Sequence, residues 1–587
     1  MKTFTLRATI GILFAVLIIS SCSLVKDFDY TVTPNPLEMH GDSIKFTVVV
    51  NVPEKGIKKT VKAEITPKLG SKSLGVWSIQ GSKISGNGQV IEFKPGGTAT
   101  FDMALAYDPS LEAADLTLTG KVFKKEKEKA EIPELKIADA TIVTPLMVRK
   151  EFGMLYQTDE LVRVTDKKIS AVINFDKGKD YVKTKELKDE DMKILLDWID
   201  SSQNNPKLEI ESISIRGYAS PDGEFAKNDN LSNDRVTSAS KAFARIMKKA
   251  KLDQYADTAS YDKKGLGEDF EEFKKQLEAT ETLAQGDKEL LLRILSKFPE
   301  PEEREKQMIK LGKSFTELEK DVFPNIRRAV ITVNYKESGL TDDEMISFST
   351  NNIDTLTVEE VLYTAENLLK DINSRVALYT ETAEPLNDSR IYNNLGALNY
   401  LQGNMEGAKK NLESSISAQA SGEANNNLAA VVLLEGDRTK SRELLSAANG
   451  MSAEKMSIVN TNSAALDILD GNYSTAESNI TTINDFSGFN KALAQVLQGK
   501  LSEAEETLSN PYNDINRGHG TYMWDHYLAA IIAARSGSGV SDVVAKLKVC
   551  FETGRTDEAE EYYKTKAAKD REFVKFFDDE IFKSTVE

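Results

Sequence analysis

Apolar and polar residues alternate with a period of two in the first quarter of the chain. Short alternating runs separated by Gly, Pro and Asn are typical of strands in an antiparallel sheet with one buried face. The pattern predicts an all-β sandwich over residues 30–148, without the Cys and Trp pattern of immunoglobulin domains. The clearest runs are IKFTVVV at 44–50, VKAEIT at 61–66, VIEF at 90–93 and DLTLTGKVF at 115–123.

Residues 165–338 mix the strand period with the helical one. The strand-like AVINF at 171–175 precedes apolar residues at helical spacing, and the alternating LEIESISIRG at 208–217 comes next. A helix is expected to begin near Ser232, because serine is a favoured N-cap, and RRAVITVNY at 327–335 is expected to be the closing strand. We predict an α+β domain here, with a charged helical insertion at about 269–322.

From residue 355 to 587 the apolar pattern is helical and repeats. Each repeat has a small residue five positions after a turn glycine and an aliphatic residue nine positions after it. The clearest copy, IYNNLGALNYLQGNMEGAKKNLESSI at 391–416, resembles a tetratricopeptide repeat, whose period is about 34 residues. The resemblance implies a solenoid of paired helices whose concave surface receives another protein. The turn glycines, spaced by 33, 35 and 28 residues, are Gly403, Gly436, Gly471 and Gly499.

The N-terminal residues predict export and lipidation. A basic start precedes an apolar run from Ile10 to Ile19, which at about ten residues is too short to cross a bilayer as a helix. We therefore predict a signal peptide over residues 1–21. Ile19-Ser20-Ser21-Cys22 resembles the bacterial lipobox, which implies acyl chains on Cys22 and a lipidated linker at 22–29. The alternative is an ordinary signal peptide with a chance cysteine.

Composition narrows the possible partners. The chain has 587 residues, a formal net charge of −17 and a pI near 5.1, so several domains and an acidic surface are expected. Nucleic acid is excluded as a partner, because no strong basic patch is present. The basic run KKEKEK at 124–129 predicts a solvated strand edge or hairpin. With one of the two cysteines at the lipobox, Cys550 is expected to be a buried, inert thiol.

The stretch GYASPDGEFAKNDNLSNDR at 217–235 resembles the ligand loop of the OmpA-like (OmpA/MotB/Pal) peptidoglycan-binding domain. That loop runs Gly-Tyr/His-Thr-Asp, a glycine three residues on, an asparagine, and then Leu-Ser-x-x-Arg. GLGE at 265–268 also resembles the Gly-x-Gly-Glu of that family. The matching positions of the loop are Gly217, Tyr218, Gly223, Asn228, Leu231, Ser232 and Arg235.

The resemblance implies that Arg235 and a loop aspartate hold the diaminopimelate of the peptidoglycan stem peptide. A planar guanidinium is suited to a carboxylate, and a place in the first turn of a helix would add free N–H groups. Arg235 instead forms a salt bridge to Asp234 or Asp222 in the alternative reading. Asn228 is expected to shape the loop more than to touch ligand, and Tyr218 completes the expected site.

Ser220 stands where the family has its aspartate, and the nearest acid is Asp222. Either the neutral serine weakens binding, or the Pro221-Asp222-Gly223 turn carries the Asp222 carboxylate to the same point. The remaining reading of Asp222 is a plain turn residue. Arg327 and Arg328 occupy the position of the closing arginine pair of the family, and one of them is expected to line the pocket.

Together these features predict a multidomain chain: a β-sandwich, an OmpA-like α+β domain and a tetratricopeptide-like solenoid. An enzyme is not expected, because His40, His519 and His526 do not converge on the expected cleft, and neither a cofactor nor a metal site is predicted. The expected function is a lipoprotein that tethers the outer membrane to peptidoglycan from the periplasmic face and recruits a protein through its repeats. The alternative is a scaffold subunit of an outer-membrane assembly, secretion or fimbrial complex, with weak or no peptidoglycan binding.

Overall fold

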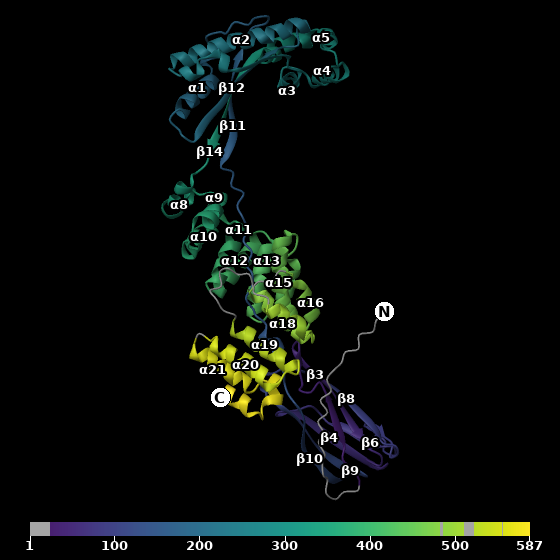
Figure 1. The fold of residues 1–587 in the computed structure, drawn as a ribbon. Coiled ribbons are helices and arrows are strands. Elements are labelled where there is room, and N and C mark those ends of the chain that lie inside the picture. The colour runs from purple at the N-terminus through teal and green to yellow at the C-terminus, as the bar shows by residue number, and fades with distance from the viewer. Residues whose placement is uncertain (1–23, 482–484, 510–521, 555) are drawn as a thin grey trace. The chain divides into compact units, whose positions relative to one another are not determined.

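The computed structural model describes residues 24–481, 485–509, 522–554 and 556–587, and Figure 1 draws its fold. The chain divides into two compact units. One unit joins the chain up to Thr158 with Leu369–Glu587, and the other is Asp159–Leu368. The first unit is therefore built from two parts of the chain that the whole second unit separates in sequence.

Strands β1 to β10 of the first unit form two sheets around one apolar core. Every second residue of β3 from Ile44 to Val52 is buried, which confirms the alternation seen in the sequence. The pairings between these described strands are antiparallel, except that of β6 with β7. The basic run at 124–129 lies at a hairpin turn, where Lys125 and Glu126 have positive φ. One sheet is β1 (Asp29–Thr33), β3 (Ser43–Val52) and β2 (Met39–His40), with β8 (Gly97–Ala106) on β3; the other is β10 (Lys127–Asp139), β9 (Asp115–Lys124), β4 (Val61–Leu69), β6 (Trp77–Gly81) and β7 (Gln89–Ile91), with β5 (Lys72–Ser73) on β4.

The second unit is built on a four-stranded mixed sheet in the order β11-β14-β12-β13. Its strands are β11 (Val164–Asn174), β12 (Leu208–Ala219), β13 (Asp262–Glu268) and β14 (Arg328–Ser338), and only β12 and β13 are parallel neighbours. Helices α1 (Glu190–Ser202) and α2 (Phe225–Lys249) share an apolar core with the sheet, to which Ile199, Ile215 and Phe243 belong. The sheet is the frame that carries the loops of the candidate site.

Helix α2 begins at Phe225, so the expected start near Ser232 is wrong. The turn at Pro221–Gly223 ends just before the helix, and Ser232 lies inside it. The Ser232 hydroxyl donates to the carbonyl of Asp229 at 2.7 Å and accepts from the amide of Gly267 at 3.0 Å. The serine therefore ties the helix to β13, and Arg235 lies in the third turn, away from the free N–H groups of the helix start.

A helical insertion follows β13, in the place where the charged sequence predicts one. It contains its own apolar cluster, which includes Phe273, Leu291, Met308 and Phe323. Because this cluster is separate from the core of the sheet, the insertion is a small packed layer in its own right. Its helices are α3 (Phe270–Ala279), α4 (Gln285–Lys297), α5 (Pro301–Ile309), α6 (Lys313–Glu317) and α7 (Phe323–Ile326), and α8 (Asp342–Asn351) and α9 (Val358–Tyr363) follow β14.

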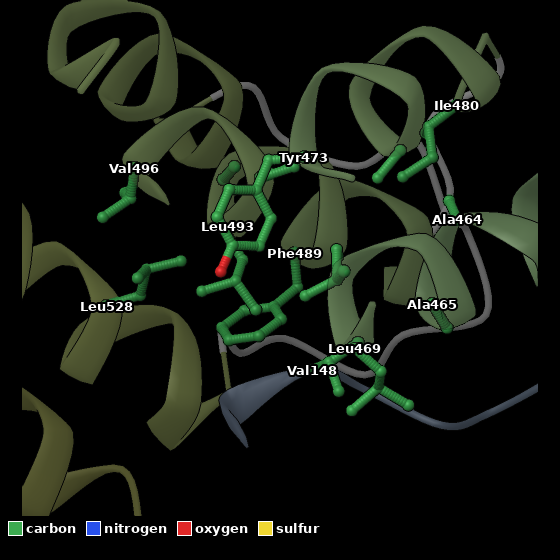
Figure 2. Packing of buried hydrophobic residues seen from close by; sticks show 14 of the residues in the cluster. Val148, Ala464, Ala465, Leu469, Tyr473, Ile480, Phe489, Leu493, Val496 and Leu528 are labelled. Atoms are coloured by element: carbon green, nitrogen blue, oxygen red, sulfur yellow. The ribbon is translucent and has the colours of Figure 1, made fainter. Parts of the chain in front are cut away.

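The C-terminal part of the chain is helical, as expected. The four turn glycines all have positive φ, between 75° and 94°, and the small residues five positions later are fully buried: Ala408, Ser441, Ala476 and Ala504. Figure 2 shows Phe489 and Leu493 directed into the cluster between neighbouring helices, with Val148 at its edge. The helices are α10 (Ile372–Leu386), α11 (Ser389–Leu401), α12 (Met405–Ala418), α13 (Gly422–Leu434), α14 (Arg438–Ala447), α15 (Ala453–Leu469), α16 (Tyr473–Asn479), α17 (Asp485–Leu497), α18 (Leu501–Ser509), α19 (Met523–Arg535), α20 (Val540–Glu552), α21 (Asp557–Ala567) and α22 (Glu580–Val586).

Within the first unit the sandwich docks against these helices. The His40 ring lies 4.9 Å from the Tyr473 ring, and a Cβ added at Gly471 would come within 2.7 Å of His40. Arg535 bridges the two parts, because its guanidinium pairs with Glu38 at 2.5 Å and with the buried Glu572 at 2.6 Å. The sandwich is thus held against the repeats by packing and by charge.

Cys550 is buried, as expected. Its Sγ donates to the carbonyl of Met523 at 3.1 Å, and burial raises the pKa of the thiol to about 12. A thiol that stays protonated at neutral pH is a weak nucleophile, so Cys550 contributes packing.

Candidate functional site

A cavity of about 390 Å³ opens beside the loop that follows β12 in the second unit. Its walls come from the turn after β11, from the loop at 220–224 and from the first turns of α2. Four of the five expected peptidoglycan-site residues line it: Ser220, Asp222, Asn228 and Arg235. The fold therefore brings most of the site expected from the sequence to one concave place.

The Asp222 carboxylate in this cavity has three side-chain partners. Its side chain is 5% exposed and accepts from Arg327 Nη2 at 2.8 Å and from Lys177 Nζ at 3.1 Å. The Ser220 hydroxyl also donates to this carboxylate and accepts from Arg327 Nε at 2.9 Å. The turn at Pro221 therefore returns the Asp222 carboxylate to Ser220, and Asp222 is more than a plain turn residue.

Arg235 is buried, with 1% of its surface exposed. Its three guanidinium nitrogens donate to three main-chain carbonyls, those of Lys179 at 3.0 Å, Tyr218 at 2.7 Å and Asp176 at 3.3 Å. Burial and the neighbouring Arg327 lower its pKa to about 10, so it stays charged at neutral pH. Arg235 forms the wall of the cavity and joins the turn after β11 to the end of β12.

Asn228 fixes the loop from the helix side. Its amide nitrogen donates to the carbonyls of Ser220 and Gly223, both at 3.1 Å, and to Glu268 Oε1 at 2.7 Å. Burial raises the pKa of Glu268 to about 7, although the bond from Asn228 acts against this shift. The carboxyl group of Glu268 therefore titrates near neutral pH, close to Asp222.

Tyr218 lies apart from the lining residues of this cavity. The Arg328 guanidinium stacks 4.5 Å above its ring and donates to Asp269 at 2.8 Å. Arg327 and Arg328 thus have different contacts. Arg327 holds the cavity loop, while Arg328 holds Tyr218 and the start of the insertion.

Lys177 belongs to the site and was missed in the sequence. Its ammonium bridges Asp222 and Glu319, and its side chain is 57% exposed. β11 and β12 both run antiparallel to β14, so the turns that follow them lie at the same end of the sheet. A basic residue in the turn after β11 can be assigned to this site only when the order of the strands in the sheet is known.

The charges define what the cavity can hold. Charged side chains of both signs line the cavity, and Arg327 contacts Asp222 from outside the lining. The lining charges are Lys177, Lys227, Arg235, Asp222, Glu224 and Asp234. A molecule that carries both an ammonium and a carboxylate can pair with both signs. The arrangement favours an amino-acid-like zwitterion over a plain anion.

The predicted membrane anchor is not tested by the described residues. No helix of the described ranges is long and apolar enough to span a bilayer. Cys22, the predicted lipidation site, lies outside the described residues, as does the signal peptide before it.

Comparisons with known proteins find matches among solved structures, at low sequence identity. No family model and no curated protein matches the sequence. Among solved structures, the chain is similar to a tetratricopeptide repeat protein from Parabacteroides merdae ATCC 43184, at 13% identity and a TM-score of 0.28. The similarity covers 38% of this chain and 89% of that chain. The repeats are therefore defined here by their own helices, turn glycines and buried small residues.

Proposed function

We propose that this chain is a non-enzymatic cell-envelope lipoprotein that tethers the outer membrane to peptidoglycan. In this proposal acyl chains on Cys22 hold the N-terminus in the outer membrane, and the second unit acts as an OmpA-like domain on the periplasmic side. The lipobox-like residues and the Gly217–Arg235 loop support it. The observation that carries wall binding is the nearly buried Asp222 carboxylate, held between Arg327 and Lys177 in an open cavity.

The proposed ligand is the diaminopimelate of the stem peptide, which carries an ammonium and a carboxylate. Lys177 is more than half exposed, so it can turn from Asp222 towards the ligand carboxylate. Asp222 then accepts the ligand ammonium in place of the lysine, and each buried charge keeps a partner. Arg235 acts as a positioning residue, because its guanidinium holds the carbonyls that shape the cavity wall.

The test is retention of the full chain on purified sacculi. Lys177→Ala removes the ligand-facing cation, and Lys179→Ala, an exposed lysine two residues away, is the matched control. A hydrogen bond to a charged group contributes about 1.5–3 kcal/mol, so we expect Lys177→Ala to weaken retention by roughly tenfold or more. Equal retention of both variants and the wild type contradicts the role of this cavity.

A second candidate function is a scaffold subunit of an outer-membrane assembly, secretion or fimbrial complex. The burial of Arg235 favours it, since a guanidinium already satisfied by three carbonyls has little left to offer a ligand. In this case the unit keeps its fold without useful affinity for the wall. Sacculus retention at background level, together with a stable partner captured by cross-linking in the envelope, supports the scaffold over the tether.

The proposed protein partner of the repeats needs a surface of its own. Residues 149–157 of this chain already lie along α11, α13, α15 and α17, where a groove ligand was expected. A partner therefore docks elsewhere on the repeats or replaces this segment.

A further inference from the structure

Four asparagines occupy equivalent positions in four successive repeats. Each lies nine residues before a turn glycine, and each is on the first helix of its pair, α11, α13, α15 or α17. All four side chains are buried, with at most 4% of the residue exposed. They are Asn394, Asn427, Asn462 and Asn490, and we call them the asparagine row.

Each member of the row bonds to both main-chain polar groups of one residue in the segment 149–157. Asn427 accepts from the Leu155 amide and donates to its carbonyl, both at 2.8 Å. Asn394 likewise accepts from the Gln157 amide and donates to its carbonyl, both at 2.8 Å. The bonds of Asn462 to Gly153 are 3.0 and 2.9 Å, and those of Asn490 to Arg149 are 2.8 and 3.0 Å. A side-chain amide thus matches the donor and acceptor of a peptide group, whatever side chain that residue carries.

Further asparagines connect the row into one network. Asn393 donates to the Leu155 carbonyl at 3.0 Å, and Asn427 donates to Asn393 Oδ1 at 3.0 Å. Asn426 donates to the Gly153 carbonyl at 3.1 Å, and Asn462 donates to Asn426 Oδ1 at 2.9 Å. Because buried amides are costly when unpaired, a network this complete indicates a groove built around an extended peptide backbone.

Three contacts add side-chain selectivity to this backbone recognition. Phe152 and Leu155 are buried in the same apolar core as the helices. Gly153 lies against α15, where an added Cβ would come within 2.6 Å of Ile458 Cγ2. The groove therefore selects an aromatic residue, then glycine, then leucine two residues later.

The residues that the asparagine row binds are not evenly spaced along the segment. Asn394, Asn427 and Asn462 bind residues two apart, as the period of an extended chain requires, but Asn490 binds Arg149 instead of residue 151. A cavity of about 470 Å³ lies at this break, lined by Glu151, Phe152, Ile458, Asn462 and Asn490 among others. The resident segment thus leaves part of the groove open.

We propose that the asparagine row is a binding site for an extended peptide, that residues 149–157 are its tethered resident ligand, and that a partner protein enters the groove by replacing them with a segment of the same aromatic-Gly-x-Leu pattern. The main-chain bonds are available to any extended chain. The apolar contacts and the close approach at Gly153 then decide which chain binds. A resident ligand on a short tether has an effective concentration of about millimolar, so it excludes weak competitors.

The test uses the full chain and a fluorescent peptide with the sequence of residues 147–158, MVRKEFGMLYQT. In a loosened variant, Phe152→Ala with Leu155→Ala, the resident segment loses its apolar contacts while the row stays intact. We expect the peptide to bind the loosened variant at least tenfold more tightly than the wild type. Two controls are expected to abolish this gain: a peptide with Gly153→Val, and Asn427→Ala added to the loosened variant.

Three results overturn the proposal. The first is equal affinity of the peptide for the wild type and the loosened variant. The second is a gain in affinity that neither control reduces. The third is no peptide binding to a loosened variant whose circular dichroism spectrum matches that of the wild type. If the loosened variant does not fold, hydrogen exchange of the wild type decides. Protection of the Gly153, Leu155 and Gln157 amides supports the resident ligand, and exchange at the rate of a free peptide refutes it.

Discussion

Substitution of Asn427 by alanine probes the asparagine row directly. The change leaves the buried Leu155 amide without its acceptor and Asn393 Oδ1 without the donor 3.0 Å away, while the Leu155 carbonyl keeps its bond from Asn393. A buried polar group left unpaired costs about 1–3 kcal/mol, so two such groups cost at least about 2 kcal/mol. Opening of the segment should therefore become roughly 25-fold more frequent or greater.

Hydrogen exchange measured by mass spectrometry on peptides that cover residues 149–157 reports this opening. Asn425→Ala is the matched control, because Asn425 is also buried on α13 but donates only to Ser421 of its own helix start, at 2.7 Å. We expect the control to change exchange of the segment by less than about fivefold, since a typical single hydrogen bond contributes about 1 kcal/mol or less. If the two variants exchange at the same rate, the row does not hold the segment.

Three further predictions concern single side chains. Glu268→Gln keeps the acceptor for Asn228. Because the folded pKa of Glu268 is raised to about 7, ionisation of this carboxyl group destabilises the fold increasingly from about pH 4.5 to 7. Thermal melts should therefore show the variant stabilised at pH 8 and unchanged at pH 4, and equal effects at both pH values would contradict this. Arg235→Ala removes three hydrogen bonds to main-chain carbonyls, of which that of Asp176 keeps a bond from the Lys179 amide. The change should cost the second unit about 2–4 kcal/mol in urea unfolding, whereas the exposed Arg245→Ala should be neutral. Arg535→Ala leaves the buried Glu572 without this partner and should cost the first unit about 3–5 kcal/mol. The loss should be smaller when Glu572→Gln is added, and a thermal melt of the double variant checks this.

Local patterns in the sequence predicted local structure well. The alternation in β3, the positive φ of the turn glycines and the burial of Ala408 and Ser441 each follow from neighbours within a few positions. Such features depend on the period of the apolar residues and on backbone conformation, which a short stretch of chain already determines.

The start of α2 shows where local reasoning fails. Ser232 has the residue type of an N-cap, but its hydroxyl bonds Gly267, which is 35 positions away in the chain. Because the hydroxyl bonds within the helix and to β13, it does not cap a helix start, and α2 begins at Phe225. The same error placed Arg235 at a helix start, whereas its guanidinium donates to carbonyls of the turn after β11 and of the end of β12.

The charged cavity was predicted in part. Ser220, Asp222, Asn228 and Arg235 come from one loop and one helix, so a contiguous stretch of sequence contains them. Lys177 comes from another strand turn, and only the order of strands in the sheet brings it to Asp222.

The asparagine row left a signal that was not used. An asparagine nine residues before every turn glycine from Gly403 to Gly499 can be read from the sequence. Its ligand cannot, because residues 149–157 are separated from the first repeat by the whole second unit. Main-chain recognition also leaves little pattern in the bound segment beyond Phe152, Gly153 and Leu155.

Calorimetric titration of the full chain with a stem tripeptide that ends in meso-diaminopimelate tests the proposed wall tether most directly. The wall tether predicts saturable heat for the wild type and for Lys179→Ala, and at least tenfold weaker binding for Lys177→Ala. Absence of heat with the wild type, or the same affinity in both lysine variants, contradicts it.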